Sequence, residues 1–426
     1  MNTLSFKQIL SSGDFNKKLL DIYADEKVID YQAERYIKAV EKFEELYGGG
    51  KISVFSAPGR SEVGGNHTDH QQGEILAAAI NLDAIAIVKE TEANLVNVVS
   101  GDCSEISVDI NDLEYKESEK ETTLSLIKGV LAGIKQSGGK LGGFNCYITS
   151  DVLIGAGLSS SAAFETLLGT IVSYMFNEGS ISTPEIAKIG QYAENVYFGK
   201  PCGLMDQMSS SVGNLVHVDF GDKENPVIEK VNVDLNEFGY SLCIIDTLGS
   251  HSDLTSEYAA IPKEMKEVAA FFGHSVLKDI TMEDILKNIN DIREKCGDRA
   301  VLRAIHFIQE NKRVREEVAA LKGGDIEAFL NTVKLSGDSS FKFLQNVYTN
   351  GNVVHQNVSV ALAVSETALA GGKGVCRVHG GGFAGTIQAF VKNEFAGEYL
   401  ETMDKIFGQG SCRILKVRKY GGMQVV

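Results

Sequence analysis

DVLIGAGLSSSAAFE, residues Asp151–Glu165, is the stretch that says most about fold and function. Two glycines precede three consecutive serines, and apolar and helix-forming residues continue to Phe176. The pattern predicts a glycine-rich loop that opens a helix. Glycines let a ligand approach backbone N–H groups, and the N-terminal end of a helix attracts anions. The serine hydroxyls add ligands for phosphate oxygens or a metal ion, so we interpret this loop as a nucleoside triphosphate site.

Other interpretations of this loop must be weighed. A plain Gly/Ser turn in which Ser159 caps the helix has the same composition. The lysine that ends a Walker A loop is missing, which disfavours a P-loop enzyme. No G-x-G-x-x-G fingerprint follows a strand with an acidic residue downstream, which disfavours a dinucleotide site. Other segments of the chain must decide.

Composition narrows the class of protein. The 426 residues suffice for two or three domains, and 43% hydrophobic and 23% charged residues are typical of a soluble globular protein. A formal charge of −16 argues against nucleic acid or an anionic membrane as partner. Seven scattered cysteines with no C-x-x-C pair indicate neither a disulfide framework nor a zinc site. With no signal peptide or transmembrane run, we expect a cytoplasmic protein; the oligomeric state is open, and a monomer is plausible.

The periodicity of apolar residues predicts a mixed α+β chain. In the first half we expect helices at Phe15–Tyr47, Leu124–Ile134, Ser160–Asn177 and Pro184–Tyr197, and strands at Ile52–Ser56, Ile75–Glu90, Leu95–Ser100, Ile106–Ile110 and Gly143–Ser150. In the second half we expect helices near Ser256–Phe272, Met282–Lys287, Ala300–Leu321, Ile326–Leu335 and Val358–Leu369, and strands near Ser241–Asp246, Val375–His379, Ile387–Val391 and Arg413–Val417. We place the boundary between the halves near residue 225.

A second informative segment, SAPGRSEVGGNHTDHQQG at Ser56–Gly73, begins at the end of the strand predicted at Ile52–Ser56. It concentrates carboxylate, amide, imidazole and guanidinium groups among four glycines and a proline. Such groups are costly to bury without partners. A solvated loop is one interpretation, and a pocket for a hydroxyl-rich ligand is the other, because these groups donate to or accept from sugar hydroxyls.

The third segment, PCGLMDQMSSS at Pro201–Ser211, holds one aspartate, Asp206, among apolar residues. It could cap a helix. If it faces Arg60, the cation keeps the carboxylate ionised, and the carboxylate orients or deprotonates an attacking hydroxyl.

The fourth segment, RVHGGGFAGTIQAF at Arg377–Phe390, places four glycines between two strands. It is either a tight turn or a second loop that closes over a phosphate.

In this order, the four segments resemble the galactokinase family of the GHMP (galacto-, homoserine, mevalonate, phosphomevalonate) kinases over nearly the whole chain. The matching motifs are PGRSEVGGNHTDH at Pro58–His70, GAGLSSSA at Gly155–Ala162, CGLMDQ at Cys202–Gln207 and GGGFAG at Gly380–Gly385, with lesser matches AEN at Ala193–Asn195, SEY at Ser256–Tyr258 and RAIHFIQEN at Arg303–Asn311.

The resemblance implies a two-domain GHMP-kinase-like fold with the active site in the interdomain cleft: a sugar- and ATP-binding domain at 1–225 and a C-terminal domain at 226–426. It implies that Asp206 is the base or orienter of the sugar's anomeric hydroxyl and that Arg60 stabilises the transferred phosphoryl group. Mg²⁺ would be held by Ser161 and Glu194. ATP would lie on Gly155, Ala156, Gly157, Leu158, Ser159, Ser160 and Ser161. The sugar would be lined by Asn66, His67, Thr68, Asp69, Gly203 and Tyr258.

The departures from the family lie in the sugar motif. Where the family has Asn-Leu-Ile-Gly-Glu, this chain reads EVGGN at 62–66, so the glutamate directed at the sugar's C6 end is Asn66, and the tyrosine after Asp69 is His70. Because an asparagine can bond a C6 hydroxyl, galactose leads as the substrate. Galacturonate, a 6-deoxy sugar or a pentose is the alternative. A non-catalytic sugar and ATP sensor of the same family is the second alternative, although the uninterrupted phosphate loop argues against it.

Overall fold

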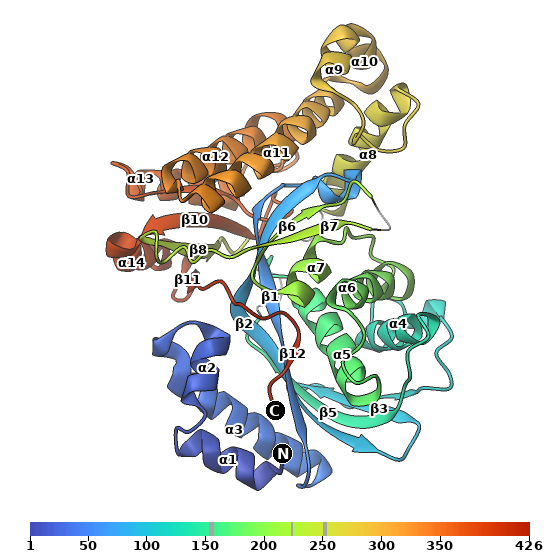
Figure 1. Cartoon of the computed structure of the whole chain (residues 1–426). Helices are drawn as coiled ribbons and strands as arrows, with labels where there is room; N and C mark the ends of the chain where they lie inside the picture. Colours follow the sequence, from blue (N-terminus) through green and yellow to red (C-terminus); the bar gives the residue numbers. More distant parts are fainter. Residues whose placement is uncertain (153–156, 223–224, 250–253) are drawn as a thin grey trace.

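The structure is a computed structural model of the chain, and it describes residues 1–152, 157–222, 225–249 and 254–426. Helices and two sheets confirm the expected α+β class (Figure 1). The larger sheet has the order β12-β1-β2-β5-β3-β4, with β6 paired to β2 and β7 to β6. Its strands are β1 (Ser53–Gly64), β2 (Glu74–Thr91), β3 (Leu95–Ser100), β4 (Ile106–Asp109), β5 (Gly143–Ser150), β6 (Leu215–Asp219), β7 (Val227–Val231) and β12 (Met423–Gln424).

Helices cover both faces of this sheet, because successive side chains of a strand point to opposite faces. Ala86 and Val88 of β2 pack in the core with α4 and α5, whereas Ile85 and Ile87 pack with α3. In Figure 1 the first three helices lie on one side of the long strands and the next four on the other. The helices are α1 (Thr3–Ser11), α2 (Asn16–Tyr23), α3 (Ile29–Tyr47), α4 (Thr123–Gln136), α5 (Ser160–Phe176), α6 (Thr183–Tyr192) and α7 (Met205–Val212).

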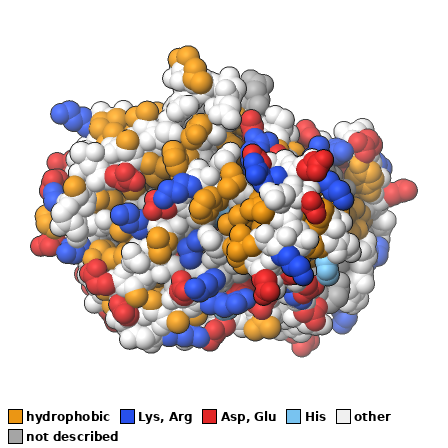
Figure 2. Space-filling view, turned by 90° about the horizontal axis from the view of Figure 1, so that it is seen from above, with side chains coloured by type: hydrophobic (Ala, Val, Ile, Leu, Met, Phe, Trp, Pro, Cys, Tyr) orange, Lys and Arg blue, Asp and Glu red, His pale blue; other side chains and the backbone are white. Residues whose placement is uncertain are grey.

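The smaller sheet is antiparallel, with the order β11-β8-β10-β9. Its strands are β8 (Tyr240–Asp246), β9 (Gly374–Val378), β10 (Thr386–Lys392) and β11 (Cys412–Leu415). Against it pack α11 (Asp298–Gly323), α12 (Ile326–Ser339), α13 (Asn357–Ala368) and α14 (Ala396–Phe407). Helices α8 (Thr255–Phe271), α9 (Met282–Lys287) and α10 (Ile289–Cys296) pack on α11 instead. Seen from above, this end of the molecule has acidic and basic side chains interspersed (Figure 2).

One hydrophobic core joins the two sheets. Val63 at the end of β1 and Leu76 of β2 lie in the same buried cluster as Val318 of α11 and Phe390 of β10. The segment that follows β1 is therefore held between the two halves. Strands β7 and β12 pair within the larger sheet although they follow residue 225. The division at 225/226 itself stays a prediction.

Several expected elements differ from the structure. The helix expected at Phe15–Tyr47 is interrupted, because Ala24 has a left-handed backbone (φ 53°) that ends α2. Strand β1 runs on to Gly64, so Arg60 lies within a strand rather than in a loop. The helix expected at Pro184–Tyr197 ends at Tyr192 and continues as a π-helical segment, Ala193–Phe198. Helices α1, α7, α10 and α14 and strands β6, β7 and β12 were not anticipated. Within the described parts of the chain, no helix combines the length and apolarity that a membrane crossing requires.

Candidate active site

Arg60, Asp206 and Ser159 meet where three elements converge. Arg60 Nε and Nη2 each lie 2.7 Å from Asp206 Oδ1, in the first turn of α7. Ser159, which precedes α5, donates its hydroxyl to the other carboxylate oxygen of Asp206. Arg60 also donates to the carbonyl oxygen of Gly157. The pairing of Arg60 with Asp206 that the sequence suggested is thus present in the structure.

Asp206 does not cap its helix, since Leu204 occupies the N-cap position without a side-chain bond. The Arg60 side chain is 7% exposed and that of Asp206 is 32% exposed. A guanidinium neutralises a carboxylate beside it, and the remaining exposure leaves Asp206 within reach of a hydroxyl group. The geometry therefore suits a carboxylate that accepts the proton of a substrate hydroxyl or orients that hydroxyl.

The phosphate loop lies directly against β1. Gly155 and Ala156 fall outside the described residues, whereas Gly157, with φ 67°, and the residues after it are described. The backbone N–H of Arg60 donates to the Leu158 carbonyl oxygen at 3.1 Å. A Cβ atom on Gly59 would lie 2.8 Å from that carbonyl oxygen, so only a glycine allows this approach. The loop then enters α5 at Ser160.

Ser161 and Glu194 also meet, with 3.1 Å between the hydroxyl and Oε1 of the carboxylate. Lys200 Nζ lies 3.1 Å from the same Oε1. Gln207 Nε2 bridges Glu194 Oε2 at 2.8 Å and Glu165 Oε2 at 3.0 Å. Burial, followed by the charge of Glu194, raises the pKa of Glu165 well above its ordinary value. Glu194 is itself in the π-helical segment, a feature frequent at functional sites.

These residues fit the kind of magnesium site that kinases use. Among the described residues there is no cluster of three or more His, Cys, Asp or Glu side chains that could hold a metal by itself. Magnesium in kinases is usually bound by one or two protein oxygen ligands and completed by substrate phosphates and water. Ser161 and Glu194 present one hydroxyl and one carboxylate beside the phosphate loop, which matches that requirement.

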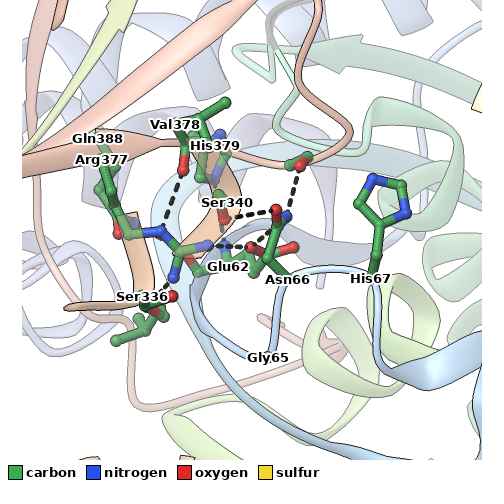
Figure 3. A network of polar contacts seen from close by, with 12 residues as sticks. Glu62, Gly65, Asn66, His67, Ser336, Ser340, Arg377, Val378, His379 and Gln388 are labelled. Carbon is green, nitrogen blue, oxygen red and sulfur yellow. Dashed lines mark hydrogen bonds and ion pairs between the residues drawn. The ribbon is translucent and has the colours of Figure 1, made fainter. Parts of the chain in front are cut away.

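Asn66 lies in a buried polar network (Figure 3). Its Nδ2 donates to Glu62 Oε1 at 2.9 Å and to the Gly380 carbonyl at 2.7 Å. Its Oδ1 accepts from Ser340 Oγ at 3.1 Å and from Asn346 Nδ2 at 2.8 Å. An amide group has two N–H donors and two acceptor lone pairs. Every hydrogen-bonding position of Asn66 is therefore taken by protein, which differs from the expected setting beside a sugar.

Glu62 completes this network. Arg377 of β9, fully buried, donates to Glu62 Oε1 at 2.6 Å. Burial raises the pKa of Glu62 to about 7, although Arg377 and Arg60 oppose the rise. The network was missed by sequence reasoning, although an arginine inside the apolar stretch VCRV was a signal that a buried acid faces it. Thr68 is also buried, and its hydroxyl oxygen lies 2.8 Å from the Gly65 carbonyl oxygen and 2.7 Å from that of Glu74, so its one proton serves these two acceptors.

His67 points away from this network (Figure 3). Its Nε2 lies 3.1 Å from the Gly381 carbonyl and, facing an acceptor, carries the proton. Burial, reinforced by His70, lowers the pKa of His67 to about 3, so the ring is neutral and Nδ1 is an acceptor. Tyr258 lies at the same glycine turn and donates its hydroxyl to the Gly382 carbonyl at 2.8 Å.

Asp69 and Gly203 are in close contact. A Cβ atom on Gly203 would lie 1.6 Å from Asp69 Oδ2, so no other residue fits there without displacing the carboxylate. Burial and the negative charge of Asp206 raise the pKa of Asp69. The charge of Asp206 is thus felt at Asp69. The binding roles of His67, Asp69, Gly203 and Tyr258 stay predictions.

Solved structures define the class of protein. The chain is similar to a galactokinase of Lactococcus lactis solved in complex with galactose, with a TM-score of 0.77 and 22% identity over 90% of this chain and 98% of that one. It also resembles the mevalonate kinase of Methanococcus jannaschii, with a TM-score of 0.57 and 17% identity over 87% and 98% of the two chains. Residues 125–214 match the model of the N-terminal domain of GHMP kinases. The two-domain fold is that of a GHMP kinase.

Sequence relatives narrow the class to one family. Residues 41–90 match the galactokinase galactose-binding signature. A galactokinase of Streptomyces coelicolor is 31% identical over 84% of this chain and 88% of its own length. One of Actinobacillus pleuropneumoniae is 31% identical over 84% and 89% of the two chains. The chain belongs to the galactokinase family, and it is a sugar kinase that uses ATP.

Proposed function

We propose that the protein is a galactose 1-kinase, which transfers the terminal phosphoryl group of ATP to the anomeric hydroxyl of galactose. The observation that carries this proposal is the contact of Asp206 with both Arg60 and Ser159. Arg60 belongs to the sugar motif and Ser159 to the phosphate loop. Asp206 is therefore held where a sugar hydroxyl and a terminal phosphate would meet.

The chemistry follows from these three side chains. Asp206 accepts the proton of the anomeric hydroxyl, or orients that hydroxyl, as its oxygen forms a bond to the terminal phosphorus. The bond between that phosphorus and the bridging oxygen of ADP breaks, and ADP carries the electron pair away. Arg60 stabilises the charge that spreads over the phosphoryl oxygens. If the Arg60 side chain moved from Asp206 to the transferred phosphoryl group, one carboxylate oxygen of Asp206 would be free to accept the proton of the sugar hydroxyl.

Ser161 and Glu194 would hold Mg²⁺ at the phosphates. The ion would supply positive charge that offsets the negative charge of the phosphates during transfer. The described residues orient these ligands firmly: Gln207 holds Oε2 of Glu194 at 2.8 Å, and the π-helical segment holds its backbone.

Two observations favour a neutral sugar over galacturonate. In the uronate alternative, Asn66 donates an N–H to the C6 carboxylate, and a protonated His70 adds attraction. Both N–H groups of Asn66 already donate to protein acceptors. Burial lowers the pKa of His70 to about 4, which makes its ring neutral at physiological pH. Glu62 contacts Asn66, and Asp69 precedes His70; a substrate carboxylate is repelled by either acid when that acid is ionised.

The proposal is tested by measuring ADP release with ATP, Mg²⁺ and a panel of galactose, galacturonate, 6-deoxygalactose and arabinose. We expect galactose to have the highest kcat/KM, with phosphate on C1 by phosphorus NMR. Asp206→Asn is the matched control, because it keeps the shape of the side chain and removes the carboxylate. A preference for galacturonate would overturn the choice of sugar. Binding of sugar and ATP without ADP release would support the sensor alternative.

A further inference from the structure

Lys200 holds a position that the proposed chemistry has not used. It stands two residues after the end of the π-helical segment at Phe198, and the backbone N–H groups of Gly199 and Lys200 donate to the Glu194 carbonyl at 2.9 and 3.0 Å. Gly199 has φ 85°, and a Cβ atom there would lie 2.0 Å from Cε of Lys120. This wide turn therefore brings the backbone of Lys200 close to Glu194 and directs the Lys200 side chain toward the Glu194 carboxylate.

The Lys200 ammonium lies where a cation is expected. Its Nζ is 3.1 Å from Glu194 Oε1, and Ser161 Oγ is 3.1 Å from the same oxygen atom. These are the two residues to which we assign Mg²⁺. In the protein by itself, the lysine thus supplies the positive charge that Glu194 needs.

Lys200 is also the cation best able to change partners. Its side chain is 63% exposed, whereas that of Glu194 is 5% exposed. An exposed ion pair through one contact is weak and exchanges readily. Arg60, by comparison, is 7% exposed and contacts Asp206 through two nitrogen atoms. A lysine ammonium is a flexible point charge that binds phosphate well. The phosphate loop has no lysine of its own, and Lys200 can provide one from another element.

We propose that Lys200 binds the nucleotide phosphates. In the free enzyme it pairs with Glu194, and when ATP binds it moves to the terminal phosphate oxygens and leaves Glu194 to the metal. The enzyme should therefore bind ATP appreciably without Mg²⁺, because the permanent positive charge of Lys200 is available to the phosphates. This inference rests on the proposed nucleotide site at Ser161 and Glu194.

The test is calorimetric titration of ATP into the full chain, once in EDTA and once with saturating Mg²⁺, for the parent and Lys200→Met. We expect Lys200→Met to weaken ATP binding in EDTA about tenfold, the loss of one charge-assisted contact, and to change it much less with Mg²⁺. Lys200→Arg should keep the metal-free affinity within about threefold, because the charge remains. Lys312→Met is the matched control, since that lysine is 76% exposed and also pairs with a carboxylate.

Equal metal-free affinity in the parent and in Lys200→Met would overturn the inference. Thermal melting of each variant identifies any loss of folding, and Lys200→Gln serves as a second neutral variant with a shorter side chain. A parent that binds no ATP even with Mg²⁺ would instead refute the proposed nucleotide site. A parent that needs Mg²⁺ for any binding, with Lys200→Met unchanged, refutes only the role of Lys200.

Discussion

Asn66→Glu places a second carboxylate in the buried network around Glu62. In the structure Asn66 Nδ2 is 2.9 Å from Glu62 Oε1, and both side chains are buried. The substitution replaces this donor by an acceptor that carries a charge. Two unit charges about 3 Å apart repel by about 5.5 kcal/mol at an effective dielectric constant near 20. The Gly380 carbonyl also loses its hydrogen bond from Asn66.

Protonation limits this penalty. Burial raises the pKa of Glu62 from 4.5 to about 7, so this site already favours a neutral acid. With a pKa of about 7, Glu62 is close to half protonated at pH 7, so completing its protonation costs less than about 1 kcal/mol, which is well below the repulsion. The pair should therefore hold one proton. Burial of the second, unpaired carboxylate and the lost hydrogen bond to Gly380 should then lower the free energy of unfolding by about 3 kcal/mol at pH 7. The parent also keeps a proton on Glu62 below about pH 7, so the variant's deficit should stay nearly constant from pH 5.5 to 7 and grow as the pH rises to 8, where only the folded variant still holds the proton.

The double variant Glu62→Asn with Asn66→Glu restores the family order of amide and carboxylate. It keeps one carboxylate beside Arg377, so it should recover at least half of the lost stability, a coupling of at least about 1.5 kcal/mol. Urea unfolding of the parent, both single variants and the double variant at pH 5.5, 7 and 8 measures this. Asn94→Glu is the control, because Asn94 is exposed. A stable Asn66→Glu at pH 8, or strictly additive single effects, would refute the reasoning.

Three further substitutions test the site. Asp206→Asn should lower kcat by about 10²–10⁴-fold while calorimetry still detects sugar binding, and near-normal turnover would remove Asp206 from the mechanism. Glu194→Gln should raise the Mg²⁺ concentration for half-maximal rate by about tenfold and leave the sugar KM nearly unchanged; an effect on the sugar KM alone would contradict the metal assignment. Gly203→Ala should weaken galactose binding about tenfold in calorimetry, because its Cβ atom would lie 1.6 Å from Asp69 Oδ2, and an unchanged Kd would contradict a sugar-binding Asp69.

Short motifs with a local mechanism were predictable from the sequence. The start of α5, the strands β3 and β5 and the helix α9 lie where the patterns place them, because glycine position and apolar period act over a few residues. From the sequence, a catalytic role for Asp206 with Arg60 could be stated only on the condition that the two side chains face each other. Their separation of 146 residues along the chain leaves no local pattern that shows this contact. The π-helical turn that aims Lys200 at Glu194 carries no sequence signal that we can name.

The family, the candidate phosphate loop and the candidate site side chains could be identified from residue type and local spacing. The direction in which those side chains point depends on how distant segments pack together. Asn66 is the clearest case: its partners Ser340 and Asn346 lie 274 and 280 residues further along the chain. A buried amide takes whatever donors and acceptors the packing of two sheets brings to it, since leaving them unpaired is costly. No local pattern contains that information.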